Sequence, residues 1–173
     1  MNIVLIGMRG TGKTTVGKLL AERLGYRFVD TDEMIMARSG KSIDEIVTRE
    51  GWERFRERET EAIEEVAGRD MHVIACGGGV VVRDENIQAL RQNGIIVWLH
   101  APVGVLAERI RRDEGALRPA LTKGANLESE LTQLAREREA VYSGAAHIAI
   151  TAQGKTPLEI VDEIIPQLNK YED

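Results

Sequence analysis

The residues best suited to chemistry lie near the start of the chain, where residues 7–14 read Gly-Met-Arg-Gly-Thr-Gly-Lys-Thr. This segment matches the pattern G-x-x-x-x-G-K-[ST], whose glycines let backbone N–H groups turn toward a phosphate without a Cβ clash. The Lys13 ammonium would add a full charge beside the β- and γ-phosphates, and the Thr14 hydroxyl suits Mg²⁺. An apolar run precedes the segment and a helical pattern follows it, so we predict a nucleoside triphosphate site.

Two carboxylates, Asp30 and Asp32, stand at the end of the next apolar run. If the chain stays extended there, both side chains project to the same side. One could then hold Mg²⁺ through water, and the other could accept a proton from a hydroxyl group. The same pattern after a strand is also typical of a helix N-cap. The residues alone leave both interpretations open.

Two segments further along carry weaker signals. Residues 51–59 are mostly charged, and the default interpretation is a solvated helix face. Three glycines at 77–79 would form a tight turn or open the backbone to close approach by a ligand, and their number favours the ligand. The run before them ends in Cys76, where P-loop proteins usually carry an aspartate. Asp30 is therefore the nearest candidate for the Mg²⁺ carboxylate.

The elements that must position these groups alternate along the chain. Short apolar runs predict buried strands, and longer segments with helical spacing predict helices. We expect strands at 3–6, 27–29, 73–75, 95–99 and 147–150. We expect helices at 13–24, 42–65, 86–92, 103–111, 127–142 and 157–168, and a polar loop at 112–125. This alternation predicts an α/β fold with a parallel sheet, in which ligands bind beyond the carboxyl ends of the strands.

Length and composition limit the possible functions. A chain of 173 residues, 43% hydrophobic and 29% charged, is expected to form a single domain with a buried core. Its formal net charge of −5 makes nucleic acid an unexpected partner. The single cysteine permits no intrachain disulfide, and the first apolar run is too short for a signal peptide or a membrane span. We therefore expect a cytoplasmic protein that does not bind membranes, with a monomer as the default.

In order along nearly the whole chain, these segments resemble the shikimate kinase family. The matching segments are 10–15, 30–32, Ser42 with Ile43, Phe55-Arg56 with Glu59, 77–79, Arg118-Pro119, and Arg138 four before Tyr142. The resemblance implies a three-layer fold like that of P-loop nucleoside monophosphate kinases, with a five-stranded parallel sheet. It also implies a substrate-binding subdomain at about 31–60 and a lid at about 111–125. The implied activity is phosphorylation of the 3-hydroxyl of shikimate by ATP, on the route to chorismate and the aromatic amino acids.

The resemblance further implies which residues act on the nucleotide. Lys13, Asp32 and Arg118 would be catalytic; Asp32 would hold the acceptor hydroxyls, and Arg118 would reach from the lid toward the transferring phosphate. Mg²⁺ would be held by Thr14 and, through water, by Asp30. The residues implied in ATP binding are Gly10, Thr11, Gly12, Lys13, Thr14, Thr15, Arg109, Arg118 and Lys155.

A second implied set binds the acceptor. The planar guanidinium groups of Arg56 and Arg138 would grip its carboxylate, and Glu59 would orient an arginine. The N–H of Gly78 would add a donor. The full set implied in acceptor binding is Asp32, Arg56, Glu59, Gly77, Gly78, Gly79 and Arg138.

Four features depart from the family pattern. Trp52 stands where glutamate is usual, and residues 118–121 read Arg-Pro-Ala-Leu in place of Arg-Pro-Leu-Leu. The common Asn-Pro is missing after Arg138, so we expect more helix there. The segment 109–118 is also slightly longer. The charged groups that the chemistry requires are all retained.

Three other classes of protein could carry the same phosphate loop. A kinase for another small hydroxy acid, such as gluconate, would use the same loop, but two arginines beside three glycines favour a rigid cyclic carboxylate. A nucleotide-dependent regulator usually needs a guanine-reading motif, and the sequence contains no Asn-Lys-x-Asp. A nucleic-acid-binding NTPase conflicts with the net charge.

The remaining notable side chains have structural interpretations. His72, His100 and His147 lie at strand ends without a second ligand at metal spacing. Trp98 is expected in the core, and Cys76 is expected to be a buried small hydrophobe. Trp52 would wall the substrate pocket or cover the subdomain, and the second role is favoured.

Overall fold

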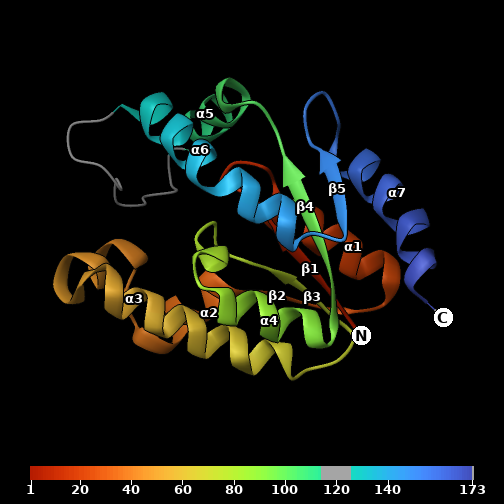
Figure 1. Ribbon diagram of the computed structural model, residues 1–173, viewed down its shortest axis with the longest axis horizontal. Helices are drawn as coiled ribbons and strands as arrows, with labels where there is room; N and C mark the ends of the chain where they lie inside the picture. Colours follow the sequence, from red (N-terminus) through yellow and green to blue (C-terminus); the bar gives the residue numbers. More distant parts are fainter. Residues whose placement is uncertain (114–125, 173) are drawn as a thin grey trace.

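Five strands form one parallel sheet in the computed structural model, which describes residues 1–113 and 126–172. The sheet has the order β2-β3-β1-β4-β5, with β1 at its centre (Figure 1). The strands are β1 (Asn2–Ile6), β2 (Arg27–Asp30), β3 (His72–Ala75), β4 (Gly94–His100) and β5 (Ile148–Thr151). The predicted α/β fold with a five-stranded parallel sheet is confirmed, and each predicted strand is present to within a few residues.

One face of the sheet is covered by α1 (Lys13–Leu24) and α7 (Pro157–Leu168) (Figure 1). Because side chains alternate along a strand, Ile3 and Leu5 of β1 pack into this layer with both helices. The helices are also joined at the surface, where Arg23 lies 3.0 Å from Asp162.

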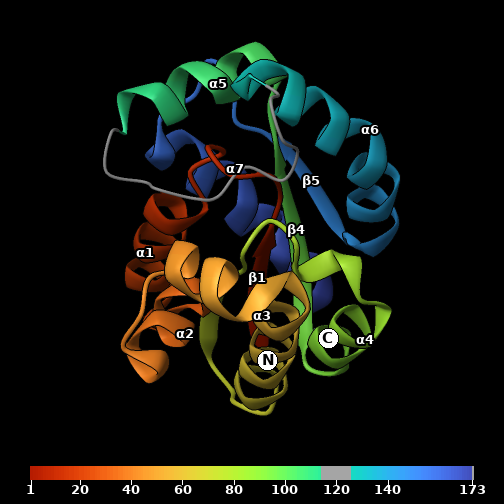
Figure 2. The same cartoon turned by 90° about the vertical axis from the view of Figure 1, so that its left-hand side faces the viewer.

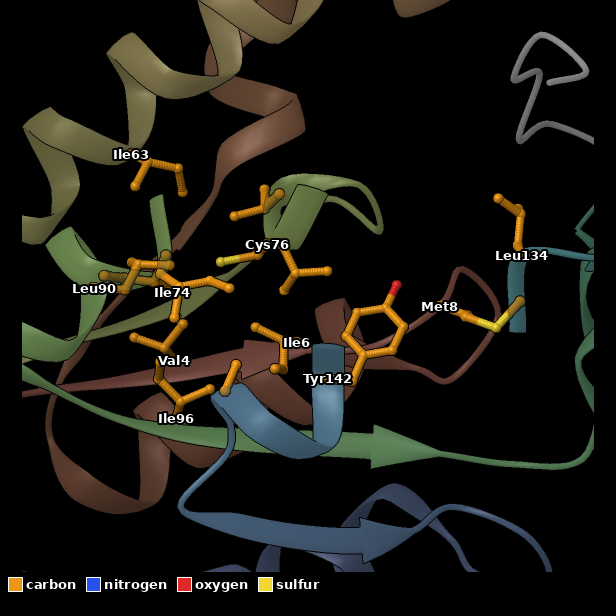
Figure 3. Close-up of a cluster of buried hydrophobic side chains, with 14 of the residues drawn as sticks. Val4, Ile6, Met8, Ile63, Ile74, Cys76, Leu90, Ile96, Leu134 and Tyr142 are labelled. Carbon is orange, nitrogen blue, oxygen red and sulfur yellow. The ribbon is translucent and has the colours of Figure 1, made fainter. Parts of the chain in front are cut away.

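The opposite face is covered by α3 (Ile43–Ala67), α4 (Asp84–Gln92) and α6 (Leu127–Ala145). Val4 and Ile6, the other two positions of the β1 alternation, point into this layer. Figure 3 shows them among side chains from all three helices, including Ile63, Leu90, Leu134 and Tyr142. The three layers are therefore set by the strand alternation of a sheet that is buried on both sides.

Above the strand ends, α5 (Val103–Arg112) packs beside α6. In the view of Figure 2, α5 and α6 lie at the top and α2 (Thr31–Ser39) and α3 lie below, with the loop after β1 between them. Two short 3₁₀ turns, at Val80–Val82 and Asn169–Tyr171, complete the described elements. Within the described residues no helix is long and apolar enough to cross a membrane. Most of the expected loop at 112–125 lies outside the described residues.

The subdomain differs from the sequence-based expectation in two ways. Helix α2 was not predicted; it forms because the Asp30 side chain accepts hydrogen bonds from the N–H groups of Asp32 and Glu33 and so caps the helix. The helix expected at 42–65 is present as α3, but Gly51 has non-helical torsions (φ 87°, ψ 165°) that divide it, a break that was not predicted. Both helices bury side chains in a separate apolar cluster, which contains Ile35, Ile43, Ile46, Phe55 and Ala62.

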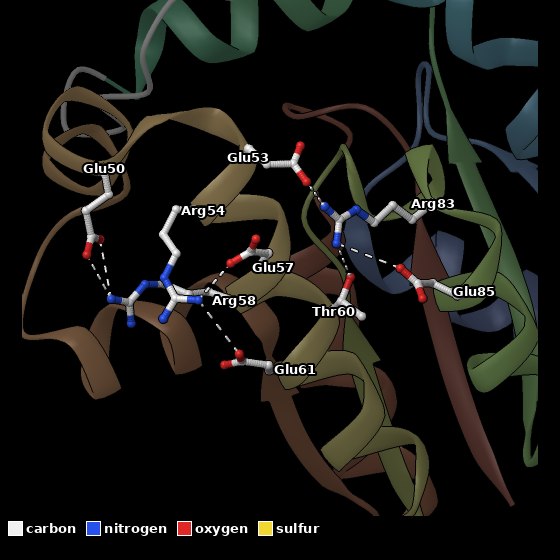
Figure 4. Close-up of polar contacts among 9 residues, drawn as sticks. All are labelled: Glu50, Glu53, Arg54, Glu57, Arg58, Thr60, Glu61, Arg83 and Glu85. Carbon is white, nitrogen blue, oxygen red and sulfur yellow. Dashed lines mark hydrogen bonds and ion pairs between the residues drawn. The ribbon is translucent and has the colours of Figure 1, made fainter.

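The charged side chains of α3 form ion pairs. Arg54 is exposed and donates to Glu57, whereas Arg58 is only 24% exposed and donates to Glu50 (Figure 4). The predicted solvated face is confirmed for Arg54 and not for Arg58. Arg83, which precedes α4, donates to Glu53 and to Thr60 and so ties the chain after the three glycines to α3.

The histidines make contacts to the backbone or to other rings. The Nδ1 of His147 accepts a hydrogen bond of 2.9 Å from the Ile96 N–H, joining β5 to β4, and the Nδ1 of His72 lies 2.7 Å from the Asp70 carbonyl. The His100 ring lies 4.8 Å from the Trp98 ring, measured between centroids. Burial lowers the pKa of both His72 and His147, which favours their neutral forms.

A helical glycine tests the packing of α1 on the sheet. A Cβ at Gly17 would lie 2.6 Å from the Phe28 ring, so Gly17→Ala should destabilise the fold by about 1–3 kcal/mol in spite of alanine's better helix propensity. At Gly104 of α5 a Cβ would meet nothing within 4 Å, so Gly104→Ala should be neutral or stabilising by up to about 1 kcal/mol. Urea unfolding of both variants measures the difference. Equal stabilities would contradict the close helix–strand contact.

Candidate active site

The loop between β1 and α1 presents an uncompensated helix N-terminus. Gly12 occupies the N-cap position with φ of 91°, no side chain caps the helix, and its first turn contains no acidic residue. By contrast, Asp30, Ser42 and Asn126 cap their own helices with side-chain oxygens. The first N–H groups of α1 and the helix dipole therefore favour an anion at this point.

Lys13 adds the full positive charge of this loop. It is 9% exposed, and its Nζ donates hydrogen bonds to the carbonyl oxygens of Gly7 at 2.5 Å and Met8 at 2.9 Å. Thr11 Oγ1 donates to the same Met8 oxygen at 3.0 Å. These bonds close the loop around the ammonium group, which places the charge beside the amide groups at the start of α1. Such an arrangement binds the phosphates of a nucleotide.

A cleft of about 880 Å³ opens in front of this loop. It brings together every described residue that the sequence implied in ATP binding. These are Gly10, Thr11, Gly12, Lys13, Thr14, Thr15, Arg109 and Lys155. Arg109 is held in place by the backbone, because its guanidinium group lies 3.4 Å from the carbonyl oxygens of Gly10 and Thr11 and donates to Ala152 at 3.0 Å. Lys155 pairs with Glu163 at 2.7 Å.

Asp30 is the helix N-cap that the sequence left as one of two alternatives, and it also contacts the nucleotide loop. One carboxylate oxygen caps α2, and the other accepts a hydrogen bond of 2.9 Å from the Thr14 hydroxyl. The chain does not stay extended between Asp30 and Asp32, because Asp32 lies in the first turn of α2. Both carboxylates nevertheless line the cleft, and Asp32 is only 8% exposed.

Two of the three glycines that follow β3, Gly77 and Gly79, are required by space. None of them has a positive φ, so a left-handed backbone is not the reason for glycine. A Cβ at Gly77 would lie 2.7 Å from Asp32 Oδ1, and a Cβ at Gly79 would overlap the Arg56 guanidinium group. Gly78 lies between the phosphate loop and Arg138, whose Nη1 would be 3.7 Å from a Cβ there. The close approach is therefore made by functional side chains of the chain itself.

Arg56 and Arg138 meet in a second, smaller cavity on the far side of Gly78. Arg56 donates to Glu59 at 2.8 Å, as the resemblance implied, and its guanidinium group also lies 5.3 Å from the centre of the Trp52 ring. Glu59 is 1% exposed; burial raises its pKa, and the charge of Arg56 opposes that change. Trp52 thus both covers the subdomain, packed against Phe55, and lines this cavity.

Sequence reasoning missed Arg9 as a residue of this region, and it missed the contacts that Tyr142 and Trp98 make here. Arg9 lines both cavities and lies 3.6 Å from Glu130 of α6, yet it occupies a variable position of the loop motif. Tyr142 is buried, and its hydroxyl donates a hydrogen bond of 2.6 Å to the Gly78 carbonyl. Trp98, expected in the core, is half-buried, and its ring stacks on the Tyr142 ring with the ring centroids 6.0 Å apart. Arg118, the remaining predicted catalytic residue, lies outside the described residues.

The fold and the loop together define a P-loop kinase: a phosphate-binding loop at the carboxyl edge of a parallel sheet, beside a second cavity lined by two arginines. The chain belongs to the shikimate kinase family, because the family model described as "Shikimate kinase" matches residues 9–169.

Individual relatives agree with this assignment. The chain is 44% identical to a shikimate kinase of Symbiobacterium thermophilum over 98% of this chain and 97% of that one. It is 45% identical to shikimate kinase 2 of Shigella boydii over 94% and 92%. The solved structure of an Acinetobacter baumannii shikimate kinase in complex with shikimate matches with a TM-score of 0.92 and 36% identity, covering 99% of this chain and 94% of that one. A Sinorhizobium meliloti gluconokinase, 21% identical over 98% of this chain and 92% of its own, with a TM-score of 0.57, shares the fold alone.

The bond between Tyr142 and Gly78 gives a test of this geometry. Tyr142→Phe should destabilise the fold by about 1–3 kcal/mol, because it leaves a buried carbonyl without its donor. Tyr171→Phe is the matched control, since the exposed Tyr171 hydroxyl donates only to the His147 carbonyl at the surface, and its cost should be within about 0.5 kcal/mol. The free energies of unfolding in urea measure both. Equal losses of unfolding free energy in the two variants would show that the buried hydrogen bond to Gly78 stabilises the fold no more than a surface hydrogen bond does.

Proposed function

We propose that this shikimate kinase transfers the γ-phosphate of ATP to the 3-hydroxyl of shikimate, with the residues of the two cavities in distinct roles. The observation that carries the proposal is the meeting of the cavities at Gly78. The phosphate loop with Lys13 lies on one side, and the guanidinium groups of Arg56 and Arg138 lie on the other. A nucleotide and a small carboxylate bound in these two places would have their reacting groups side by side, which is most of what phosphoryl transfer requires.

On the nucleotide side, Lys13 and the N-terminus of α1 neutralise the charge of the phosphates. The neighbouring oxygens of Thr14 and Asp30 suit Mg²⁺, which takes hard oxygen ligands and usually keeps several waters. Mg²⁺ would supply further charge neutralisation on the phosphates there. No group of three or more His, Cys, Asp or Glu side chains within residues 1–113 and 126–172 is placed to hold a metal by protein ligands alone. Such a pair of oxygens is typical of an ion that arrives with its nucleotide.

On the acceptor side, Asp32 lines the nucleotide cleft close to Gly77, one residue before the point where the cavities meet, and is the group suited to align the attacking hydroxyl and accept its proton. Arg56 and Arg138 bind the carboxylate, and Glu59 holds the Arg56 guanidinium group in position. The backbone N–H of Gly78 adds a donor between them. Helices α2 and α3, with their own apolar cluster, form the acceptor subdomain at about 31–60.

We also propose a cytoplasmic monomer. The thiol of Cys76 is buried and free, and burial raises its pKa, so it fits a reducing compartment without depending on one. The exposed large apolar side chains come from separate elements. They are Met1, Met71, Val82, Val141, Leu158 and Tyr171.

A coupled assay of ADP release tests the substrate. ATP should be consumed with shikimate and not with gluconate or without acceptor, and Lys13→Ala should lower turnover by about 100-fold or more while the chain stays folded. Circular dichroism checks the fold of the variant. Turnover with gluconate but not with shikimate, or near-normal turnover of Lys13→Ala, would contradict the proposal.

A comparison of two arginine variants in α6 distinguishes acceptor binding from a general effect of removing positive charge. Arg138 lines the acceptor cavity, whereas Arg136 is exposed on the same helix. Arg138→Ala should raise the KM for shikimate by about 10- to 100-fold, the effect of losing a charge-assisted hydrogen bond, and should leave the KM for ATP nearly unchanged. Arg136→Ala should change neither. An unchanged shikimate KM in Arg138→Ala would mean that the carboxylate is held elsewhere.

A further inference from the structure

Arg9 occupies a place that the division into a nucleotide side and an acceptor side does not explain. It is the one cationic side chain, among the described residues, that lines both the nucleotide cleft and the acceptor cavity. Only Gly78 shares this property, and it has no side chain. The Arg9 backbone nitrogen lies 3.7 Å from the point where a Cβ on Gly78 would be, so Arg9 stands at the junction of the two cavities.

Glu130 holds the Arg9 side chain near this junction through an ion pair. Its carboxylate lies 3.6 Å from the Arg9 guanidinium group, and the exposed fractions of the two side chains are only 6% and 22%. Glu130 belongs to α6, the helix that also carries Arg138 toward the acceptor cavity. The pair therefore links the phosphate loop to the helix that binds the acceptor. A pair with so little exposure is weakly screened by water and salt, unlike a surface ion pair.

The charges of the two substrates give this link a function. ATP and shikimate are both anions, and in adjoining cavities each one opposes the binding of the other. A rigidly fixed cation would attract each of them separately and leave the ratio of affinities unchanged. The Arg9 guanidinium group is 22% exposed and 3.6 Å from its partner, so the first anion can draw it into the junction and the second anion then binds a cation already in place. Lys13 and Arg138 cannot do this equally well, because each lines only one of the two cavities.

We propose, on the basis of the function proposed above, that Arg9 couples the binding of nucleotide and acceptor and that Glu130 is the positioning residue that holds it between them. The coupling is the ratio of the shikimate dissociation constants measured without and with nucleotide. The proposal concerns this ratio and not the affinity for either ligand alone.

Calorimetric titration of shikimate into the full chain tests this proposal, first alone and then with saturating Mg²⁺ and a non-hydrolysable ATP analogue. In the unaltered chain, nucleotide should tighten shikimate binding by about fivefold or more. Arg9→Met should reduce the ratio to one or below, Glu130→Gln should reduce it in part, and Arg9→Lys should restore part of it. The control is Arg23→Met, which breaks the exposed pair between α1 and α7 and should keep the ratio unchanged.

The outcomes separate this inference from the function on which it rests. A ratio of one in the unaltered chain, or the same ratio in Arg9→Met and the unaltered chain, overturns the coupling role while leaving the kinase activity intact. Shikimate that fails to bind the unaltered chain in either titration would instead overturn the proposed function. If thermal unfolding shows that Arg9→Met does not fold, Glu130→Gln decides, and an unchanged ratio there overturns the proposal.

Discussion

The absence of side chains at residues 77–79 is the constraint on which the rest of the site depends. Asp32 and the Arg56 guanidinium group approach Gly77 and Gly79 more closely than a Cβ would allow, and the phosphate loop and Arg138 lie against Gly78 between them. Each of them comes from a different part of the chain. The three glycines thus let four segments that are distant in sequence meet at one point, and the carboxyl end of β3 supplies the rigid support.

The sequence predicted best the features that depend on local pattern. The strands and most helices follow from hydrophobic periodicity, and the phosphate loop follows from a spacing that has a direct physical reason. The failures have physical causes too. Helix α2 depends on the Asp30 cap, which competed with an equally valid metal-binding interpretation, and the break in α3 depends on one glycine torsion. The pairing of Arg9 with Glu130 joins residues far apart in the sequence, so no local sequence pattern predicts it.

The cations of the site are held by carboxylates in a chain of net negative charge. Glu59 bonds to Arg56, Glu130 lies beside Arg9 and Glu163 pairs with Lys155, so each partner restricts the position of a flexible cation. Restricting these side chains before the substrates arrive lowers the entropy cost of binding. The negative partners also reduce the attraction for anions in general. The site therefore gains selectivity for ligands of matching shape rather than for negative charge as such.

The burial of Cys76 has a practical consequence. This residue is the only cysteine in the chain, it lies between the end of β3 and the three glycines, and it is 2% exposed in the apolar layer that Figure 3 shows. Its thiol reacts with alkylating reagents only as thiolate and only when solvent reaches it. The rate of its modification therefore reports how often the centre of the sheet opens. The alkylation rate of Cys76, measured by mass spectrometry, therefore reports transient unfolding of the protein without an introduced label.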